Sequence, residues 1–454
     1  MLTMTTCKLM LKVLVPLALI VMMVSTVYAA PPTLLWSDAV ETSEIDVSKD
    51  GNYAVSAVRA GGINQWQVRF YSRSSGTPIW ISNPPEETQM ISVAISADGD
   101  CVVAGSSSFG AVWFFKGART LTGNPPPTWV SEDLHGTINR GCLDISDDGN
   151  YVVACGAGKN VLYWRDARSK SGGYGANIPP TWQKEIGTGV YSADLSSDGD
   201  YVAAGYSAPV TDDMSVAYWK NARTLSGTPA PDWSSTEPDQ WVSDIAVSDD
   251  GNYVAAACGV DTVYYWANAK SLGGNPPTKW WYGVGVSFSS IAMSSDGDKV
   301  VAGAEYAGKG VYFWSGARGL TGKPQAPTWT YTTTGDVHDV AIDATGAYMA
   351  AVNDVATPPF IYFLNSAGTL LWSFELPYPS HFLSISSDGS TLAVQTYESP
   401  NTGYLFDTGY TSAPRPVGGV AIPTNKLEIL APYLALVGLI AAVFTVVVVK
   451  RRRD

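Results

Sequence analysis

Apolar and polar residues alternate along most of the chain in short runs that are typical of β-strands. The clearest example is the segment 144–155, in which an alternating run leads into the turn Ser146–Gly149 and then into the apolar run Tyr151–Cys155. A Ser-x-Asp-Gly turn between two such runs predicts a β-hairpin, because glycine readily takes the positive φ that a tight turn requires. We therefore expect two antiparallel strands here.

Close copies of this hairpin recur along nearly the whole chain. The seventh copy departs from the pattern, with Asp343-Ala-Thr-Gly346 in place of the usual turn. The turn glycines are spaced by 43 to 52 residues, at Gly51, Gly99, Gly149, Gly199, Gly251, Gly297, Gly346 and Gly389. A period of this length indicates a repeat array.

Two further strands are expected after each hairpin. The third strand is an aromatic-rich run such as Val161–Trp164 or Val311–Trp314. The fourth is marked by a tryptophan, at Trp36, Trp80, Trp129, Trp182, Trp233, Trp280, Trp329 and Trp372. Eight units of four strands predict an all-β fold, an eight-bladed β-propeller.

The order of the strands predicts how the ring closes. A lone tryptophan strand, Leu34–Trp36, precedes the first hairpin, and the last unit ends at Tyr404–Phe406 without one. Pairing these two segments would complete the last blade and remove two open sheet edges. The N-terminal strand is therefore expected to close the propeller.

The repeats resemble those of known propeller families. Ser290–Gly303 is similar to the inner hairpin of WD repeats, and Ile361–Trp372 resembles the tryptophan-bearing unit of quinoprotein-like blades. Residues 33 to about 410 therefore resemble WD-repeat and quinoprotein-like propellers. The resemblance implies the fold and does not imply an activity.

The two ends of the chain predict export and anchoring. An apolar core follows Lys8 and Lys12 and leads to small residues around Ala29, which is typical of a cleaved signal peptide, with an uncleaved anchor as the alternative. The apolar run Ile429–Val449 is long enough to span a bilayer, and the basic residues after it favour a cytoplasmic C-terminus. The expected domains are a signal peptide (1–29), a propeller ectodomain (30–410), a linker (411–428), a transmembrane helix (429–449) and a cytoplasmic basic tail (450–454).

The tail from Pro414 to Tyr433 resembles those of some archaeal membrane-anchored surface proteins. This resemblance and the terminal segments imply a single-pass protein of the cell membrane with its propeller outside the cell. Residues 30–449 carry 22 basic and 40 acidic residues, a net charge of about −18. Such a surface repels phosphate backbones, so a nucleic-acid partner is not expected.

Four cysteines follow the expected signal peptide. If the turn at Gly149 is an even-numbered hairpin loop, Cys142 and Cys155 face each other across the two strands. A disulfide is then possible in an oxidising compartment, and two buried thiols are the alternative. Cys101 and Cys258 fall in blades two and five and are expected to be buried thiols.

The loops that vary between repeats are candidates for ligand binding. They join the second strand to the third and one blade to the next, on the face opposite the Ser-x-Asp-Gly turns. Loops held by a rigid scaffold commonly carry binding residues. The ligand-face candidates are Trp66, His135, Asp212, Asp213 and Trp241, and ordinary solvated loops are the alternative.

Acidic residues recur at fixed positions of the innermost strand. Asp46, Asp144 and Asp194 lie five residues before their glycines, and Asp244 and Asp339 lie seven before. Carboxylates that converge on a central channel could hold Ca²⁺. The alternative is that they hydrogen-bond the backbones of the blades, and no metal site is firmly predicted.

Two of the three histidines share one repeat position. His338 and His381 each lie eight residues before the glycine of adjacent blades. Two imidazoles near the channel could ligate a metal or act as a base, and neutral hydrogen-bonded histidines are the alternative.

Catalytic signatures are scarce in the sequence. It has no Gly-x-Ser-x-Gly, His-Glu-x-x-His or P-loop motif, and no adjacent cysteines. We therefore predict a membrane-anchored interaction or scaffold module for a surface protein or glycan. The alternative is an extracellular enzyme, either a glycoside hydrolase that uses channel carboxylates or a quinoprotein-like oxidoreductase. The sequence leaves the oligomeric state open.

Overall fold

The computed structural model describes residues 31–412 apart from short gaps, which are 61–64, 86–87, 108–109, 134–136, 139–140, 157–159, 187–188, 208–214, 239–240, 284, 355–357 and 397–401. The predicted signal peptide, transmembrane helix, basic tail and archaeal-type tail lie outside the described residues, as does most of the predicted linker. Within the described part of the chain, no helix is long and apolar enough to cross a bilayer.

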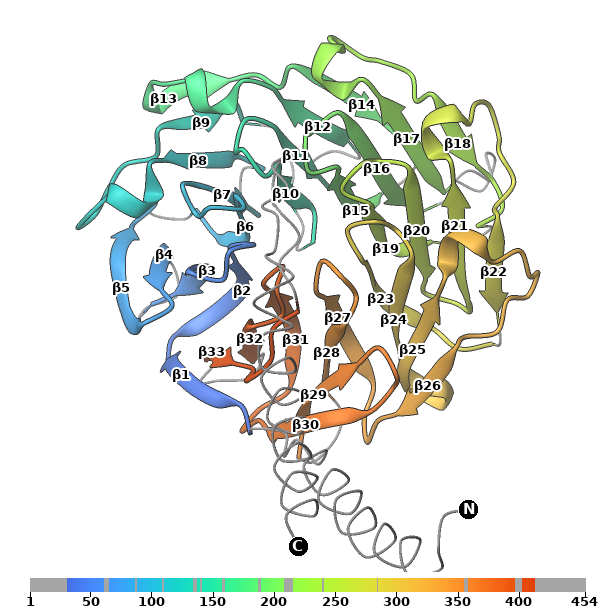
Figure 1. The fold of residues 1–454 in the computed structure, drawn as a ribbon. Coiled ribbons are helices and arrows are strands. Elements are labelled where there is room, and N and C mark those ends of the chain that lie inside the picture. The colour runs from blue at the N-terminus through green and yellow to red at the C-terminus, as the bar shows by residue number, and fades with distance from the viewer. Residues whose placement is uncertain are drawn as a thin grey trace, which may run out of the picture. The chain divides into compact units, whose positions relative to one another are not determined.

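The described residues form eight sheets arranged as blades around a central axis (Figure 1). Blades 1 to 4 contain, in order, β2 (Glu41–Val47), β3 (Tyr53–Arg59), β4 (Trp66–Ser72) and β5 (Ser75–Ser82); β6 (Met90–Ile95), β7 (Cys101–Ser106), β8 (Val112–Lys116) and β9 (Trp129–Ser131); β10 (Leu143–Ile145), β11 (Val152–Cys155), β12 (Asn160–Trp164) and β14 (Trp182–Glu185); and β15 (Val190–Leu195), β16 (Tyr201–Tyr206), β17 (Val216–Lys220) and β18 (Trp233–Ser235). Blades 5 to 8 contain β19 (Val242–Val247), β20 (Tyr253–Cys258), β21 (Thr262–Ala267) and β22 (Trp280–Gly283); β23 (Phe288–Met293), β24 (Lys299–Ala304), β25 (Gly310–Ser315) and β26 (Trp329–Thr332); β27 (Val337–Ile342), β28 (Tyr348–Asn353), β29 (Phe360–Asn365) and β30 (Leu370–Glu375); and β31 (Ser380–Ile385), β32 (Thr391–Thr396), β33 (Gly403–Asp407) and β1 (Thr33–Asp38).

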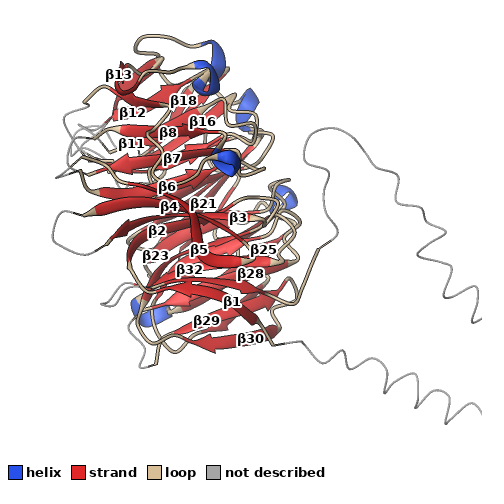
Figure 2. Cartoon of the chain, turned by 90° about the vertical axis from the view of Figure 1, so that its left-hand side faces the viewer, coloured by secondary structure: helices blue, strands red, loops and turns tan. Residues whose placement is uncertain are grey.

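The prediction of an all-β, eight-bladed propeller is thus confirmed. The first strand of each blade lies innermost, and Figure 2 shows that strands make up nearly all of the ring. Short 3-10 helices lie in the connections: η1 (Ala118–Thr120), η3 (Ala167–Ser169), η4 (Ala222–Thr224), η5 (Ala269–Ser271), η6 (Tyr306–Gly308) and η7 (Ala317–Gly319).

The Ser-x-Asp-Gly turn is held by its own side chains. In blade 3, Ser146 Oγ donates to Asp148 Oδ1 and accepts a hydrogen bond from the Tyr151 amide. Gly149 has a φ of +71°, and a Cβ there would lie 2.7 Å from Cys101 of the neighbouring blade. In the seventh copy an aspartate takes the place of the serine, and the Asp343 carboxylate accepts the amide of Tyr348.

The N-terminal strand closes the ring as predicted. β1 pairs antiparallel with β33, so the last blade takes its outer strand from the start of the chain. Trp36 stacks on Tyr71 of blade 1, with ring centroids 4.7 Å apart, and its Nε1 donates to the Ser72 carbonyl at 3.2 Å. The first and last parts of the propeller are therefore joined by both backbone and side-chain contacts.

Apolar cores lie between adjacent blades, one at each of the eight seams. The tryptophan of each outer strand also reaches the next blade. Trp80 Nε1 donates to the Ala118 carbonyl at 2.8 Å and Trp182 Nε1 to the Ala222 carbonyl at 3.0 Å, at the start of 3-10 helices. The repeated tryptophan therefore joins adjacent blades by a hydrogen bond in addition to the apolar area that it buries.

Blade 2 differs from the predicted four-stranded unit. The segment β13 (Gly173–Ile178), which belongs to the long connection of blade 3, pairs in parallel with the outer strand β9. It covers an edge that would otherwise expose unpaired backbone groups. Its position reflects a contact between blades that a pattern within one repeat does not contain.

Candidate functional site

The central channel contains a cavity of about 440 Å³ that is lined by the first strands of the blades. A ring of backbone hydrogen bonds runs around one end of the channel, at residues one or two before the turn glycines. In it, the Ala97 amide donates to Asp147, the Ser197 amide to Asp249, and the Ser387 amide to Lys49, and the remaining blades continue the series. This closed series of bonds fixes the diameter of the channel at the end that carries the turns.

Lys49 sits at the same end of the channel. Its Nζ lies 2.6 Å from Asp147 Oδ1 and 3.4 Å from Asp249 Oδ1, so it joins blade 1 to blades 3 and 5. Burial alone would lower the pKa of Lys49, but the carboxylates of Asp249 and Asp147 raise it above its usual range. The side chain is therefore a cation held across the channel by two carboxyl groups.

The predicted channel carboxylates do converge on this cavity, and their oxygens hold backbone amides. Asp46 accepts the amides of Val47 at 2.8 Å and of Ile95, in the next blade, at 3.0 Å. Asp194 likewise accepts the amides of Leu195 at 2.9 Å and of Val247 at 2.6 Å. Each carboxylate therefore ties its own strand to the first strand of the next blade.

Asp244 and Asp339 make the same tie two residues earlier in the repeat. Asp244 Oδ2 accepts the Ile291 amide at 2.9 Å, and Asp339 Oδ2 accepts the Leu383 amide at 2.9 Å. Ser290 lies between them, and its hydroxyl is within hydrogen-bond distance of both carboxylates. Because these oxygens face N–H and O–H donors, the arrangement matches the backbone-bonding alternative and leaves few lone pairs for Ca²⁺.

Burial shifts the pKa of these acids upward. It raises the pKa of Asp46 to about 6 and of Asp339 to about 7, and it also raises that of Asp244. Asp144 and Asp194 are hydrogen-bonded to each other; burial raises the pKa of both, and the charge of Asp144 raises that of Asp194 further. Part of the acidic lining is therefore protonated near neutral pH.

The open rim of the cavity is formed by residues at one repeat position. In seven blades the pairing register of the first strand shifts around the residue eight before the glycine, as in a β-bulge, which re-aims a side chain. Five of these residues line the cavity: Tyr191, Ser243, Ser289, His338 and His381. The shared position of the two histidines was therefore informative, because it places them on the rim.

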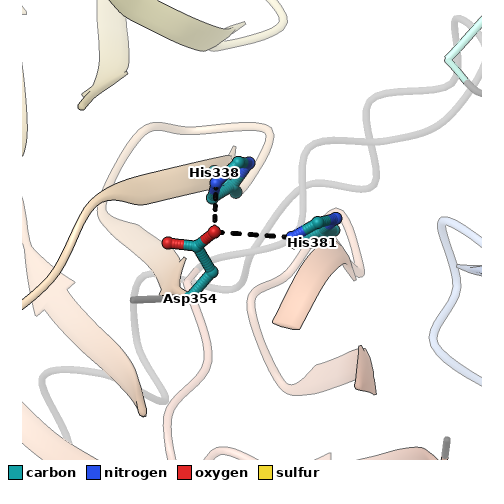
Figure 3. A group of neighbouring side chains, drawn as sticks. All are labelled: His338, Asp354 and His381. Carbon is teal, nitrogen blue, oxygen red and sulfur yellow. Dashed lines mark ion pairs between the residues drawn. The ribbon is translucent and has the colours of Figure 1, made fainter. Parts of the chain in front are cut away.

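The two histidines face one carboxylate (Figure 3). His338 Nε2 lies 2.6 Å and His381 Nε2 lies 3.6 Å from Asp354 Oδ2, and the imidazoles stack with centroids 4.3 Å apart. The other nitrogen of His338, Nδ1, lies 3.4 Å from Glu305 Oε1. Burial raises the pKa of Glu305, whereas the neighbouring His338 lowers it. We call His338, His381 and Asp354, with Glu305 beside them, the rim histidine cluster.

An exposed aromatic pair lies on the same rim. Trp241, a predicted ligand-face residue, is 50% exposed, and its neighbour Tyr191 is 45% exposed, with ring centroids 6.5 Å apart. The indole packs so closely on Gly259 that any Cβ there would overlap Trp241. These residues line a second pocket of about 290 Å³, to which Glu305 also contributes. We call Tyr191 and Trp241 the aromatic patch.

Trp66 does not belong to a binding surface, contrary to prediction. It is 9% exposed and packs in the core between blades 1 and 2, because it begins strand β4 and points into the seam. The other ligand-face candidates, His135, Asp212 and Asp213, lie outside the described residues.

The cysteines occupy the positions that the hairpin register indicates. Leu143 lies opposite Ala154 and Asp144 opposite Val153, which is the register of an even-numbered loop, and Cys142 and Cys155 are joined by a disulfide with a Cα–Cα distance of 4.8 Å. Cys101 and Cys258 are buried and take no part in a disulfide.

Sequence reasoning missed Asp354, Glu305 and Tyr191. Asp354 and Glu305 each lie eight residues after their turn glycines, and Tyr191 lies eight before Gly199, at the same position as the two histidines. In a hairpin these two positions meet at the same end. Comparing residues at equal distances on both sides of each glycine would have found the cluster.

No protein-family model and no curated protein sequence matches the chain. Solved structures do match it. The C-terminal WD40 domain of Sif2 is similar with a TM-score of 0.61 at 13% identity, over 83% of this chain and 98% of that one. Raptor of Chaetomium thermophilum is similar with a TM-score of 0.53 at 12% identity, over 86% of this chain and 30% of that one.

These similarities define the class of the protein at the level of fold. The chain is an eight-bladed β-propeller whose architecture is similar to that of a WD40 domain. The further resemblance of one unit to quinoprotein-like blades stays a prediction from the sequence.

Proposed function

We propose that this chain is a cell-surface scaffold that binds a partner protein on the open rim of its channel. The observation that carries the proposal is the aromatic patch. Tyr191 and Trp241 are about half exposed, whereas the aromatic side chains that stack between strands and blades are mostly buried in the seams. Tyrosine and tryptophan are enriched among the residues that dominate binding energy at protein interfaces.

Backbone strain supports the same face. Tyr306, which follows Glu305 on the rim, is 69% exposed and has a φ of +56°. A bulky residue in this region of φ is strained, and such strain is concentrated at functional sites. Its amide donates to Asp336 Oδ1 at 3.0 Å, so a neighbouring loop holds the strained residue.

Charge indicates the chemistry of the partner. The carboxylates of Glu305, Asp336 and Asp354 lie together on the rim beside the patch, and residues 30–449 carry a net charge of about −18. An anionic surface around an apolar centre favours a segment with an apolar side chain flanked by lysine or arginine, and it accelerates the encounter at low salt.

Three features support a location outside the cell. They are the signal-like segment 1–29, the apolar segment 429–449 and the disulfide between Cys142 and Cys155, which is typical of oxidising compartments. A membrane-impermeant label applied to intact cells is expected to react with propeller lysines. Labelling only after lysis would contradict this part of the proposal.

The enzyme alternative has no comparable support. Asp144 and Asp194 are in direct hydrogen-bond contact, whereas glycoside hydrolases separate their two carboxyl groups by about 5 to 10 Å. Asp144 also accepts the Leu195 amide, and Asp194 accepts the Val247 amide. These groups therefore act as ties between blades.

The binding test uses a photo-crosslinking amino acid at position 191 in the full chain on intact cells. We expect one dominant adduct that falls at high salt and that weakens at least tenfold with Trp241→Ala, because truncating a central aromatic residue costs about 2 kcal/mol or more. The matched control places the crosslinker at Glu185, an exposed position on the outer strand β14.

Three outcomes would contradict the proposal. The first is equal crosslinking at positions 191 and 185. The second is binding to a glycan array that depends on Trp241, which would indicate a sugar ligand instead. The third is depletion of an applied sugar or peptide, which would indicate catalysis.

A further inference from the structure

The rim histidine cluster contains more residues than a single hydrogen-bonded histidine–aspartate pair needs. An aspartate and one histidine explain the 2.6 Å contact of His338 with Asp354, but a second imidazole also faces the same oxygen, at 3.6 Å. We propose that His338, His381 and Asp354 form a binding site for a divalent transition metal of the zinc type.

The donor atoms fit this chemistry. One atom from each of the three side chains lies within 4.8 Å of the other two. Zinc binds histidine nitrogen and carboxylate oxygen at about 2.0 to 2.2 Å, which in a tetrahedral site separates the donors by roughly 3.3 to 3.5 Å. The distances of 2.6 and 3.6 Å from Asp354 Oδ2 bracket this value, and all three donors lie within 4.8 Å of one another. Binding therefore requires the donors to close by up to about 1.5 Å and the stacked imidazoles to rotate until both nitrogens point at the ion. Two imidazoles also favour zinc, copper or nickel over calcium and magnesium, which prefer oxygen ligands.

The surroundings of the donors are those of a metal site. His338 offers Nε2 to the cluster, and its Nδ1 lies 3.4 Å from Glu305 Oε1, as in sites where a carboxylate orients a ligating histidine. The second oxygen of Asp354, Oδ1, is buried and has no hydrogen-bond partner among the described residues. A bidentate carboxylate or a metal-bound water would satisfy that oxygen, whose isolation is otherwise unfavourable.

Three different strands hold the ligands. His338 comes from β27, Asp354 directly follows β28, and His381 comes from β31 of the next blade. A bound metal would therefore link blades 7 and 8. Three protein ligands leave a fourth position, and both histidines line the channel cavity, so that position is accessible to water or to a donor group of a bound molecule.

The test titrates Co²⁺ into the full chain after treatment with a chelator, with no histidine tag present. We expect one Co²⁺ per chain, with the visible absorption of a four- or five-coordinate ion, which Zn²⁺ displaces. His338→Ala, His381→Ala and Asp354→Asn are each expected to weaken binding at least tenfold. Glu305→Gln should weaken it by about 10 to 100-fold while preserving the spectrum, because Glu305 only orients a ligand.

The matched control is His135→Ala, which removes the third histidine of the chain and should leave the titration unchanged. Near-ultraviolet circular dichroism of each metal-free variant verifies that the ring is folded. The proposal is wrong if folded wild-type chain binds no stoichiometric Co²⁺, if His381→Ala binds it as the wild type does, or if His135→Ala abolishes it. Because the probe is the metal alone, the result does not depend on whether the aromatic patch binds a protein.

Discussion

Individual carboxylates in the channel accept hydrogen bonds that would otherwise require backbone pairing between blades. The first strands of adjacent blades are not paired in one sheet, so their inward amides need acceptors. Asp244 accepts the amide of Ile245 in its own strand and the amide of Ile291 in the first strand of the next blade. It also accepts hydrogen bonds from the hydroxyls of Ser192 and Ser290. One side chain therefore satisfies four donors.

Asp244→Ala is expected to destabilise the propeller by about 2 to 4 kcal/mol, because it leaves the Ile291 amide without its acceptor and removes three further hydrogen bonds. Chemical denaturation of the full chain measures this change. Glu185→Ala, on the exposed outer strand β14, is the control and should stay within about 0.5 kcal/mol of the wild type. Equal effects of the two variants would contradict the role of Asp244.

Residue roles were predictable only where repeat position fixed them. The inward position of Asp46, Asp144 and Asp194 followed from their constant offset, as did the shared rim position of His338 and His381. The prediction that Trp66 lies on the ligand face was wrong, because its position in a loop-like stretch does not reveal that the side chain turns into a seam between blades. The partners Asp354 and Glu305 were missed because they depend on how the second strand of each hairpin meets a shifted first strand.

The blades are not equally joined. The core at the closing seam, between blades 8 and 1, contains seven buried hydrophobic residues, whereas that between blades 1 and 2 contains sixteen. Polar contacts replace apolar area at the closing seam. Asp38 of β1 accepts Arg69 Nη1 at 2.7 Å and the Tyr71 hydroxyl at 2.6 Å, and Arg73 Nη2 lies 2.7 Å from Asp407 Oδ2. This seam is therefore the natural place for the ring to open.

Deletion of residues 31–40 is expected to open that seam. The deletion removes β1, exposes the edge of β33 and should cause aggregation that increases with protein concentration, because open strand edges pair with other chains. A synthetic peptide of residues 31–40 should restore the monomer by pairing with β33. Size-exclusion chromatography with light scattering measures both effects.

The control for this rescue is the same peptide with Trp36→Ala. It keeps the backbone that pairs with β33 but loses the stacking on Tyr71, so rescue should be weaker. A deleted chain that stays monomeric and as stable as the wild type would show that β1 does not hold the ring closed.

At the level of elements, the period of the sequence predicted more than its local pattern did. Counting the repeats predicted eight hairpins and eight tryptophan strands. It also predicted that blade 8 takes its outer strand from the start of the chain. β13 did not, because it pairs with a strand of another blade and has no counterpart in the other repeats. The short 3-10 helices were not among the predicted elements, since three residues leave no periodic signal.

Across the whole ring, the buried acids make stability depend on pH in an unusual direction. An acid whose pKa is higher in the folded than in the unfolded chain binds its proton more tightly when folded. Burial raises the pKa of Asp46 to about 6 from a usual value of 3.8, and it also raises the pKa of Asp144 and Asp194. The contribution of Asp46 to stability is therefore present below pH 4 and is lost as the pH rises through about 6, and the contributions of Asp144 and Asp194 are lost in the same direction.

Acids in the turns have the opposite effect at lower pH. Burial alone would raise the pKa of Asp148, but hydrogen bonds from Asn150 and Ser146 lower it below its usual value. Such a group stabilises the fold above the unfolded pKa of about 4, and this contribution is lost as the pH falls further. The two effects together predict a stability maximum between about pH 4 and 6, on the acidic side of neutrality.

Thermal unfolding of the full chain in the presence of a chelator, from pH 4 to pH 8, tests this prediction. The midpoint should fall between pH 5 and pH 8, and Asp46 alone should contribute about 1.4 kcal/mol to that fall, since about one pKa unit of its shift lies above pH 5 and one unit corresponds to about 1.4 kcal/mol. Asp46→Asn should flatten the slope because it removes the titrating group, whereas Glu185→Gln should not change it. A midpoint that rises steadily towards pH 8, or an unchanged slope in Asp46→Asn, would mean that the channel acids are ionised throughout and that the hydrogen bonds to Ile95 and Ser384 outweigh their burial.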